Sequence, residues 1–385
     1  MEVYLDNCAT TQPREEVVEE MVHVLREEYG NPSSLHRLGL KAEKRIENAR
    51  ENIADFLKVS KEEIYFTSGG TESNNIAIQS IIRKYSKMGK HIITTAIEHP
   101  SVSNIYSFYE KQGFETTYLK VDERGIISME ELENAIREDT ILIAIMQVNN
   151  EIGSIQPTWN IKEIIKKKNS KALLHVDGVQ AFGKIRLNIK DWGIDTFSLS
   201  GHKVYGPKGI GALYIDKKLK INPIIYGGNQ ERGLRSGTEN VPGIVGLGKA
   251  VEILNKNFEN EQEKVGIIKS YFIKRLKEEI DHIRINSPSG EYSSPYILNV
   301  SFEYVRGEVL LHYLENKGIY VSTTSACSSR SSKQSRVLKE IGLSDIDMEG
   351  AIRFCFSYRI TKEDIDYTVE VLKESVKDIR RITMR

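Results

Sequence analysis

The sequence predicts an α/β protein with a large, doubly wound and mostly parallel sheet, followed by a smaller α+β unit. Apolar runs of strand length alternate with amphipathic stretches of helical period as far as about residue 243. This alternation is typical of parallel strands that are connected by crossover helices, which cover both faces of the sheet. A long helical stretch and a second group of strands and helices follow, and they predict the smaller unit.

The elements of the larger unit are predicted from the period of their apolar residues. Residues 17–28 and 40–57 have helical spacing. A short strand at 63–67 runs into two glycines, and a helix at 75–85 follows. Further helices are expected at residues 128–137 and 161–168, and further strands at residues 91–95, 115–119, 140–146, 172–176, 196–199 and 211–215.

A connecting helix is expected at residues 244–280, because this stretch has helical period and carries no strand signal. Beyond it we expect strands at 296–302 and 351–357 and helices at 307–316 and 362–381. A Ser-rich segment at about 322–335 indicates an exposed, mobile loop. We therefore expect a large domain of residues 15–258 and a small domain of residues 1–14 and 259–385.

The composition excludes several classes of protein. Lys plus Arg and Asp plus Glu each number 54, so there is no bulk electrostatic reason to bind nucleic acid or an anionic membrane. The 3 Cys include no Cys-x-x-Cys pair, which argues against a disulfide framework and against an intrinsic zinc site. The longest strongly apolar run, residues 141–146, is far shorter than the roughly 20 residues that cross a bilayer. We expect a cytoplasmic protein, and its acidic start is unlike a signal segment.

Residues 68–75 (SGGTESNN) lie between a predicted strand and a predicted helix. Free backbone N–H groups at the start of a helix hold anions, and the glycines allow a phosphate to come close. The alternative is an ordinary strand-to-helix turn with a Ser or Thr cap, and the motif alone does not decide between the two. A Walker motif is excluded, because the string from Gly201 to Gly206 continues with Pro207 instead of Lys.

Two charged residues follow buried strands at the edge where open α/β sheets bind ligands. Asp177 ends the run at 172–176, and Lys203 follows the strand at 196–199. Each has a simpler explanation, a helix cap for Asp177 and a solvated charge for Lys203. Together they match what pyridoxal phosphate requires, since a lysine forms its Schiff base and an acid pairs with its pyridine nitrogen.

These segments together resemble the cysteine desulfurases of the NifS/IscS type, which are class V, fold-type I pyridoxal-phosphate enzymes. The resemblance runs nearly from end to end. Its motifs are residues 4–11 (YLDNCATT), 30–34 (GNPSS), 67–75 (TSGGTESNN), 98–100 (EHP), 149–153 (NNEIG), 175–180 (HVDGVQ), 200–203 (SGHK), 235–240 (RSGTEN), 325–327 (SAC) and 352–354 (IRF).

The resemblance implies a role for each matching residue. Lys203 would bond the cofactor, Asp177 would pair with its pyridine nitrogen, and His99 would stack on its ring. Asn149 and Gln180 would contact the phenolate oxygen of the cofactor. Its phosphate would be held by Gly70, Thr71, Ser200 and His202, and by Thr238 from the second subunit of a homodimer. The substrate would be bound by Arg353, Asn7 and Asn149. Arg353 also has a reason of its own, because an unpaired charge within an apolar strand would be costly, although a structural ion pair is the alternative.

The three cysteines have different settings. Cys327 lies in a polar segment with Arg330 and Lys333, and cationic neighbours with exposure favour the thiolate. The family resemblance makes it the residue that takes sulfur, and it implies a capacity to ligate a transient iron–sulfur cluster shared with a scaffold. Cys355 alternates with two Phe residues and is expected to be an unreactive strand residue. Cys8 stands where the family usually has Asn, and its role stays open.

The expected activity is conversion of L-cysteine to L-alanine, with sulfur captured as a persulfide on Cys327. A sulfur-acceptor protein would follow, either a scaffold for iron–sulfur clusters or a tRNA-thiolation protein. The sequence ends at Arg385, soon after its last helix, so contact with a scaffold through a longer tail is in doubt. The alternatives are another class V enzyme, such as an aminotransferase or a selenocysteine lyase, and a sulfur-relay scaffold without catalysis.

Overall fold

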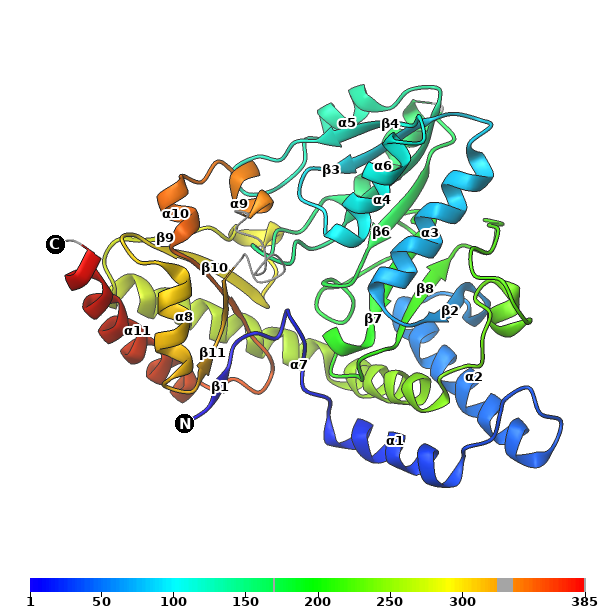
Figure 1. The fold of residues 1–385 in the computed structure, drawn as a ribbon, viewed down its shortest axis with the longest axis horizontal. Helices are drawn as coiled ribbons and strands as arrows, with labels where there is room; N and C mark the ends of the chain where they lie inside the picture. The colour runs from blue at the N-terminus through cyan, green and yellow to red at the C-terminus, as the bar shows by residue number, and fades with distance from the viewer. Residues whose placement is uncertain (169, 324–334, 384–385) are drawn as a thin grey trace.

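A seven-stranded sheet forms the centre of the larger part of the molecule (Figure 1). The computed structural model describes residues 1–168, 170–323 and 335–383. Along the sheet the strands stand in the order β2-β8-β7-β6-β5-β3-β4, and β8 runs antiparallel to both neighbours. The strands are β2 (Ile64–Thr67), β3 (His91–Thr95), β4 (Glu115–Leu119), β5 (Thr140–Met146), β6 (Leu173–Asp177), β7 (Thr196–Ser200) and β8 (Gly211–Ile215).

Helices cover both faces of this sheet, as the continuous apolar strands require. One face packs against α3 (Gly70–Tyr85) and α4 (Pro100–Glu110), which meet β3 and β5 through Ile82 and Val102. The other face packs against α2 (Arg37–Leu57), α5 (Met129–Ala135), α6 (Ile161–Lys167) and the start of α7. Every residue of β5 is buried, so the apolar run at 141–146 reflects a strand covered on both sides.

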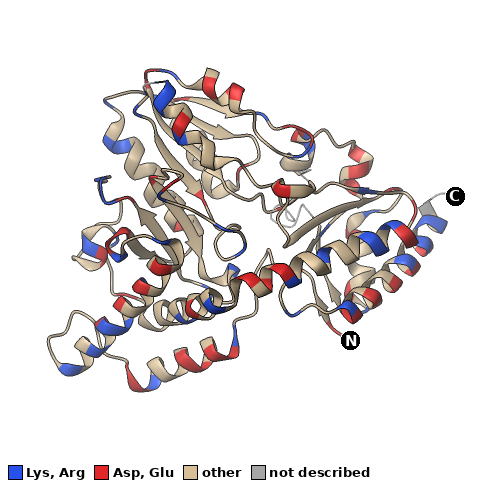
Figure 2. Ribbon diagram, turned by 180° about the vertical axis from the view of Figure 1, so that it is seen from behind, with Lys and Arg blue, Asp and Glu red and all other residues tan. Residues whose placement is uncertain are grey.

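The long helix α7 (Val241–Glu279) connects the two parts of the molecule (Figure 1). It packs against α1 (Glu15–Glu27) and α2 near its start and against α11 (Lys362–Thr383) further along. A Cβ at Gly248 would lie 2.5 Å from Ala49 Cβ, so this glycine allows α2 and α7 to approach closely. Acidic and basic residues alternate along α7 and α11 (Figure 2), on the sides that face away from the core.

The smaller part is built around a four-stranded antiparallel sheet in the order β12-β13-β10-β9. Beside it, β1 from the N-terminus pairs in parallel with β11, more than 300 residues later in the chain. The strands are β1 (Val3–Tyr4), β9 (Ile283–Ile285), β10 (Ile297–Phe302), β11 (Ile319–Tyr320), β12 (Ser322–Thr323) and β13 (Ala351–Cys355), and the helices are α8 (Gly307–Glu315), α9 (Arg336–Glu340), α10 (Asp345–Glu349) and α11.

The predicted fold class is confirmed: the molecule is α/β, with a large, mostly parallel sheet and a smaller sheet of its own. No described helix is long and apolar enough to span a bilayer. The expected domain boundaries stay a prediction. The expected Cys loop at 322–335 overlaps β12 at its first two residues and Ser335 at its end, and residues 324–334 lie outside the described residues.

Candidate active site

Asp177 lies at the carboxyl end of β6, at the centre of the large sheet, and it is buried. Its Oδ2 accepts a hydrogen bond of 2.8 Å from Asn74 Nδ2 on α3, and its Oδ1 accepts one of 3.0 Å from the Val179 N–H. Ser198 Oγ on β7 lies 3.4 Å from Oδ1. These donors fix the orientation of the Asp177 carboxyl group, the acid that would pair with a pyridine nitrogen.

A hydrogen-bond network behind Asp177 reaches the proposed ring-stacking residue, His99. Asn74 accepts a hydrogen bond of 3.0 Å from His175 Nε2 through its Oδ1 and donates one of 2.9 Å to Ser101 Oγ. Ser101 Oγ in turn lies 2.8 Å from His99 Nδ1. Burial lowers the pKa of His175 to about 4, so this imidazole is neutral near neutral pH.

Lys203 follows β7 in a short 3-10 turn (Gly201–Lys203), and its side chain points to the N-terminal segment. Its Nζ donates to the carbonyl oxygen of Cys8 and, at 2.8 Å, to that of Ala9. Gln180 Nε2 also donates to the Cys8 oxygen, at 3.0 Å. The turn after β1 therefore brings Lys203 and Gln180 to one backbone carbonyl.

Burial lowers the pKa of Lys203 to about 8, and the positive charge of Lys184 lowers it further in the same direction. Lys184 is itself buried and donates a 2.7 Å hydrogen bond to Gln180 Oε1. With a pKa of about 8, roughly a tenth of Lys203 is the uncharged amine at pH 7, far more than of an ordinary lysine. The uncharged amine is the form that reacts with an aldehyde or accepts a proton.

The two histidines proposed for the site are also held neutral. Burial lowers the pKa of His202 to about 4, with smaller contributions from Lys203 and Lys208. Burial lowers the pKa of His99 as well, and the charge of Asp177 opposes this shift. A neutral ring at His99 can stack on an aromatic cofactor without adding a positive charge beside Lys203.

The start of α3 forms a cradle for an anion. Gly69 has φ 150° and Gly70 is the first residue of the helix. A Cβ at Gly70 would lie 2.4 Å from Val179 Cγ2, so a larger residue does not fit here. A Cβ at Gly69 would lie 3.7 Å from Ser200 Oγ, which places that hydroxyl beside the first N–H groups of α3.

Two proposed phosphate contacts, Thr71 and Thr238, are exposed in this single chain. Arg235 donates through Nε to Glu72 Oε1 at 3.1 Å and so fastens the segment before Thr238 to the start of α3. Thr238 is thus exposed three residues after one that contacts the start of α3. Whether it serves the cradle of a second subunit stays a prediction.

Arg353 lies in β13 and is buried. Its Nη2 donates to Asp6 Oδ1 at 2.9 Å, and its Nη1 donates to the Asn150 carbonyl oxygen at 3.0 Å. Its Nε is buried and has no hydrogen-bond partner among the described residues. This arginine therefore combines the structural ion pair that the sequence left open with an unsatisfied donor that a carboxylate can use.

Asn7 and Asn149 are both buried, and their amides are engaged with the backbone. Asn7 Nδ2 donates to the Cys355 carbonyl oxygen at 2.9 Å. Asn149 Nδ2 donates to the Ile97 carbonyl oxygen at 3.2 Å, and its Oδ1 accepts from the N–H of Glu151 at 2.9 Å. Asn7 thus lies in the turn that carries Cys8, and Asn149 lies just after the end of β5.

Cys8 and Cys355 are buried against each other in this region. Cys355 lies two residues after Arg353 on β13, so the two side chains point to the same face of the strand. The Cys355 thiol donates a hydrogen bond to Cys8, and this bond with nearby Lys184 and Arg353 lowers the pKa of Cys8 against the opposing effect of burial. Cys327, Arg330 and Lys333 lie outside the described residues.

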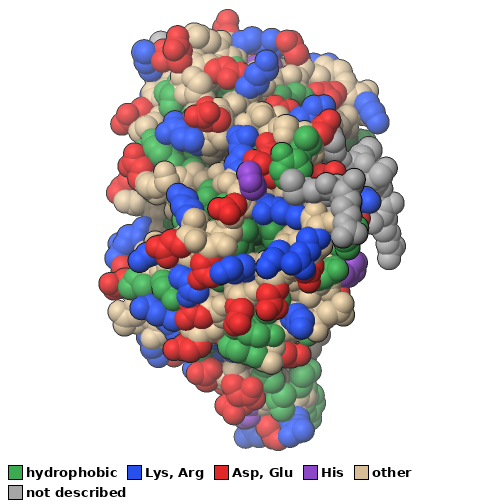
Figure 3. Space-filling view, turned by 90° about the vertical axis from the view of Figure 1, so that its left-hand side faces the viewer, with side chains coloured by type: hydrophobic (Ala, Val, Ile, Leu, Met, Phe, Trp, Pro, Cys, Tyr) green, Lys and Arg blue, Asp and Glu red, His purple; other side chains and the backbone are tan. Residues whose placement is uncertain are grey.

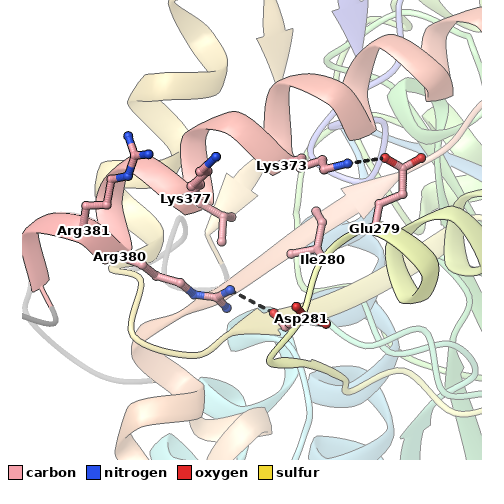
Figure 4. A pocket seen from close by; sticks show the side chains of 8 residues that line it. Glu279, Ile280, Asp281, Lys373, Lys377, Arg380 and Arg381 are labelled. Carbon is pink, nitrogen blue, oxygen red and sulfur yellow. Dashed lines mark hydrogen bonds and ion pairs between the residues drawn. The ribbon is translucent and has the colours of Figure 1, made fainter.

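A separate cavity of about 510 Å³ lies between the end of α7 and α11 (Figure 4). Its walls carry charges that bind within the chain: Lys373 pairs with Glu279 at 3.1 Å, and Arg380 donates to the Asp281 carbonyl oxygen at 2.9 Å. Figure 3 shows acidic and basic side chains interspersed over this end of the molecule. These contacts hold α11 against α7 and add nothing to the site at Lys203.

The sequence pattern of the family "Aminotransferase class-V" matches residues 3–368. The chain belongs to the class-V aminotransferase family. A cysteine desulfurase IscS from Dictyoglomus turgidum is 46% identical over 382 residues, which cover 99% of this chain and 96% of that relative. The mitochondrial cysteine desulfurase of Saccharomyces cerevisiae is 42% identical over 385 residues, covering 99% of this chain and 76% of the relative.

Solved structures with a similar fold agree with this family assignment. A NifS-like protein has a TM-score of 0.92 with 41% identity and covers 98% of this chain and all of that chain (100%). A structure described as SspA in complex with cysteine has a TM-score of 0.81 with 37% identity, covering 93% of this chain and 100% of that chain. The resemblance inferred from the motifs is confirmed.

Class-V enzymes of this kind use pyridoxal phosphate, and the described residues fit that cofactor. An anion cradle at Gly70, a buried carboxyl group at Asp177 and an amine of lowered pKa at Lys203 lie at one edge of the sheet, where β2 leads into α3, β6 ends and β7 leads into its 3-10 turn. Sequence reasoning missed the partners Asn74, His175 and Asp6. Asn74 belongs to the 67–75 motif, but the residue it contacts is 103 positions away.

Proposed function

We propose that this protein is a cysteine desulfurase that converts L-cysteine to L-alanine and passes the sulfur to an acceptor. The observation that carries the proposal is Lys203, a buried amine with a lowered pKa, held by two carbonyl oxygens in the same site as Asp177. The relatives that bear the name cysteine desulfurase match nearly the full length of this chain. Their names support this activity over amino-group transfer.

Pyridoxal phosphate, when bound, supplies an electron-withdrawing ring that makes the Cα proton of an amino acid acidic. Lys203 would bond the cofactor and, once its amine is released, remove that proton. Asp177 would hold a proton on the pyridine nitrogen, and His99 would lie against the ring. Gly70, Thr71, Ser200 and His202 would hold the phosphate, and Asn149 and Gln180 would donate to the phenolate oxygen.

Arg353 would bind the carboxylate of L-cysteine. Its guanidinium is kept charged, because Cys355, Cys8 and then Asp6 raise its pKa against the effect of burial. Burial also leaves its Nε without a partner among the described side chains, so a substrate carboxylate would satisfy a donor that is otherwise unpaired. Asn7 would border the substrate from the turn that carries Cys8.

Cys327 would take the sulfur. Its thiolate would attack the substrate sulfur, so that the carbon–sulfur bond of L-cysteine breaks and a sulfur–sulfur bond forms on Cys327. The carbon skeleton leaves as L-alanine after protonation, and the persulfide is passed on. We propose a sulfur-acceptor protein as the recipient, in iron–sulfur cluster assembly or tRNA thiolation, with Cys327 able to ligate a transient cluster.

The assembly is proposed to be a cytoplasmic homodimer in which Thr238 completes the phosphate site of the other subunit. Its exposure and the attachment of its segment to Glu72 through Arg235 support a role at the surface of the subunit. The division into a large domain of residues 15–258 and a small domain of the remainder is likewise proposed. The turn after β1 and the strand β13 would then meet the large domain at the site.

Purified protein with bound cofactor tests the activity. L-cysteine should yield alanine in the absence of any keto acid, and Cys327→Ala should lose persulfide formation while keeping the visible absorbance of the cofactor. Lys203→Ala should lose the absorbance of the covalently bound cofactor. Alanine formation that requires a keto acid would instead show an aminotransferase, and normal sulfide release by Cys327→Ala would refute the role of Cys327.

A further inference from the structure

The turn at residues 149–153 touches three parts of the proposed site through consecutive residues. Asn149 is the proposed contact of the cofactor ring, and the Asn150 carbonyl oxygen accepts the hydrogen bond from Arg353. The carboxyl group of Glu151 accepts a hydrogen bond from Ser335 Oγ. Ser335 is the first described residue after 324–334.

This turn is fixed in place by the second sheet. Gly153 has φ +76°, and its N–H donates to the Asn149 carbonyl oxygen at 3.0 Å. Asn299 Nδ2 on β10 donates to the Glu151 carbonyl oxygen at 3.2 Å, and the Ser294 N–H donates to the Gly153 oxygen at 2.8 Å. The backbone of Glu151 is therefore held, and a change in its carboxyl group acts on its side-chain partners.

Ser335 has two roles at the start of α9. Its hydroxyl donates to Glu151, and its oxygen accepts the N–H of Leu338 at 3.1 Å, which caps the helix. Leu338 is fully buried in a cluster with Ile97 and Met146. Glu151 thus fixes the point at which the chain enters a short helix that packs against the end of β5.

The carboxyl group of Glu151 is buried and feels the charge of Arg353. Burial raises the pKa of this carboxyl to about 7, while the Ser335 hydrogen bond and the charge of Arg353 oppose the shift. Arg353 is the charged group that acts on it from β13, and Asp6 accepts a hydrogen bond from the same guanidinium. A second carboxylate at Arg353 would add negative charge near Glu151 and favour its protonated form.

We propose that Glu151 is a positioning residue. It couples the binding of an amino-acid carboxylate at Arg353 to the strength of the hydrogen bond that Ser335 donates to Glu151 at the start of α9. A carboxylate at Arg353 leads Glu151 to take up a proton from solvent. The hydrogen bond from Ser335 then loses its charged acceptor and weakens, because charge-assisted hydrogen bonds are roughly twice as strong as neutral ones. Conversely, an ionised Glu151 offsets part of the charge of Arg353 and weakens carboxylate binding. This inference rests on the proposed function.

The test is the affinity of the holoenzyme for the product L-alanine, followed by the absorbance of the bound cofactor from pH 6 to pH 8.5. Affinity of the wild type should fall about fivefold or more as pH rises through 7. Glu151→Gln is neutral at every pH, and its affinity should hardly change over this range. Ser335→Ala removes a donor that stabilises the ionised carboxylate, so its transition should lie at higher pH. Glu123→Gln, an exposed turn residue, should match the wild type.

Hydrogen exchange of α9, followed by mass spectrometry, gives a second measurement. At pH 7.5, L-alanine should speed exchange in residues 336–343 of the wild type, and Glu151→Gln should exchange fast with or without L-alanine. The coupling would be overturned if the affinity for L-alanine changed with pH in the same way in wild type and Glu151→Gln. It would also be overturned if L-alanine left the hydrogen exchange of the wild type unchanged. Alanine production from L-cysteine by the wild type is measured on the same samples, so loss of the proposed function and loss of the coupling are told apart.

Discussion

The buried pair Arg50–Glu231 should contribute strongly to stability, because it fastens the segment that leads to Thr238. Both side chains are nearly inaccessible, at 5% and 3% exposure, and two parallel hydrogen bonds of 2.9 Å join them. Glu231 Oε2 also accepts the Phe66 N–H at 2.8 Å. Glu231→Gln would remove the charge and leave the guanidinium of Arg50 buried beside a neutral amide.

The expected loss follows from this burial. Removing one partner of a buried ion pair costs about 3–5 kcal/mol when the other charge is left alone. Arg50 Nε keeps an ion pair of 3.0 Å with the exposed Glu47, so the loss should lie toward the lower end of this range. The Phe66 N–H can still donate to the amide oxygen of the glutamine, so this hydrogen bond adds little to the expected loss of stability. Replacing both partners, as in Arg50→Met with Glu231→Gln, should cost less than the sum of the two single changes, since no buried charge remains.

Urea unfolding at fixed protein concentration and saturating cofactor would give the free energies of unfolding, with mass action held constant. Glu51→Gln is the control, because Glu51 pairs with Lys61 at 2.6 Å on the exposed side of α2 and should matter little. A loss below about 1 kcal/mol for Glu231→Gln, or strictly additive single changes, would refute the assignment of a buried, strongly coupled pair.

Three further predictions concern the site. Capture of pyridoxal phosphate by the cofactor-free protein should speed up as pH rises through about 8, the pKa of Lys203, and Lys184→Gln should move this midpoint to higher pH in stopped-flow absorbance. Gly70→Ala should weaken cofactor binding at least about tenfold in titrations, and Val179→Gly in the same chain should restore part of it, because the two side chains would otherwise overlap. The pKa of His175 is about 4 in the folded protein, against 6.5 in the unfolded chain. Its contribution to stability is therefore present above pH 6.5, and up to about 3 kcal/mol is lost as pH falls to 4. His175→Gln should flatten the pH dependence of the urea midpoints measured over that range.

The strands of the large sheet could be predicted because burial on both faces leaves a continuous apolar run, as in β5. The short strands β1, β11 and β12 have two residues each and carry no such run, since they are fixed by distant partners. Asp177 and Lys203 could be placed at one edge because both follow strands of a parallel sheet.

The partners of these residues could not be predicted in the same way. Lys203 binds the carbonyl oxygens of Cys8 and Ala9, and every residue type has a carbonyl, so no side chain marks this contact. Cys355 was expected to be inert because apolar residues flank it, although the strand period of two already puts it on the same face as Arg353. The contact with Cys8 depends on a pairing of Asp6 with Cys355 across the whole chain.

That pairing has a consequence for biosynthesis. The N-terminal segment leaves the ribosome first, yet its partners in β11 and β13 lie more than 300 residues later. The last strand of the large sheet ends at Ile215, so this sheet can form while synthesis continues. The carbonyl groups that bind Lys203 are placed only after the strands near the end of the chain have been synthesised. A nascent chain halted before residue 351 should therefore fold its central sheet without retaining cofactor, and the amine of Lys203 would gain its final setting only in the last stage of synthesis.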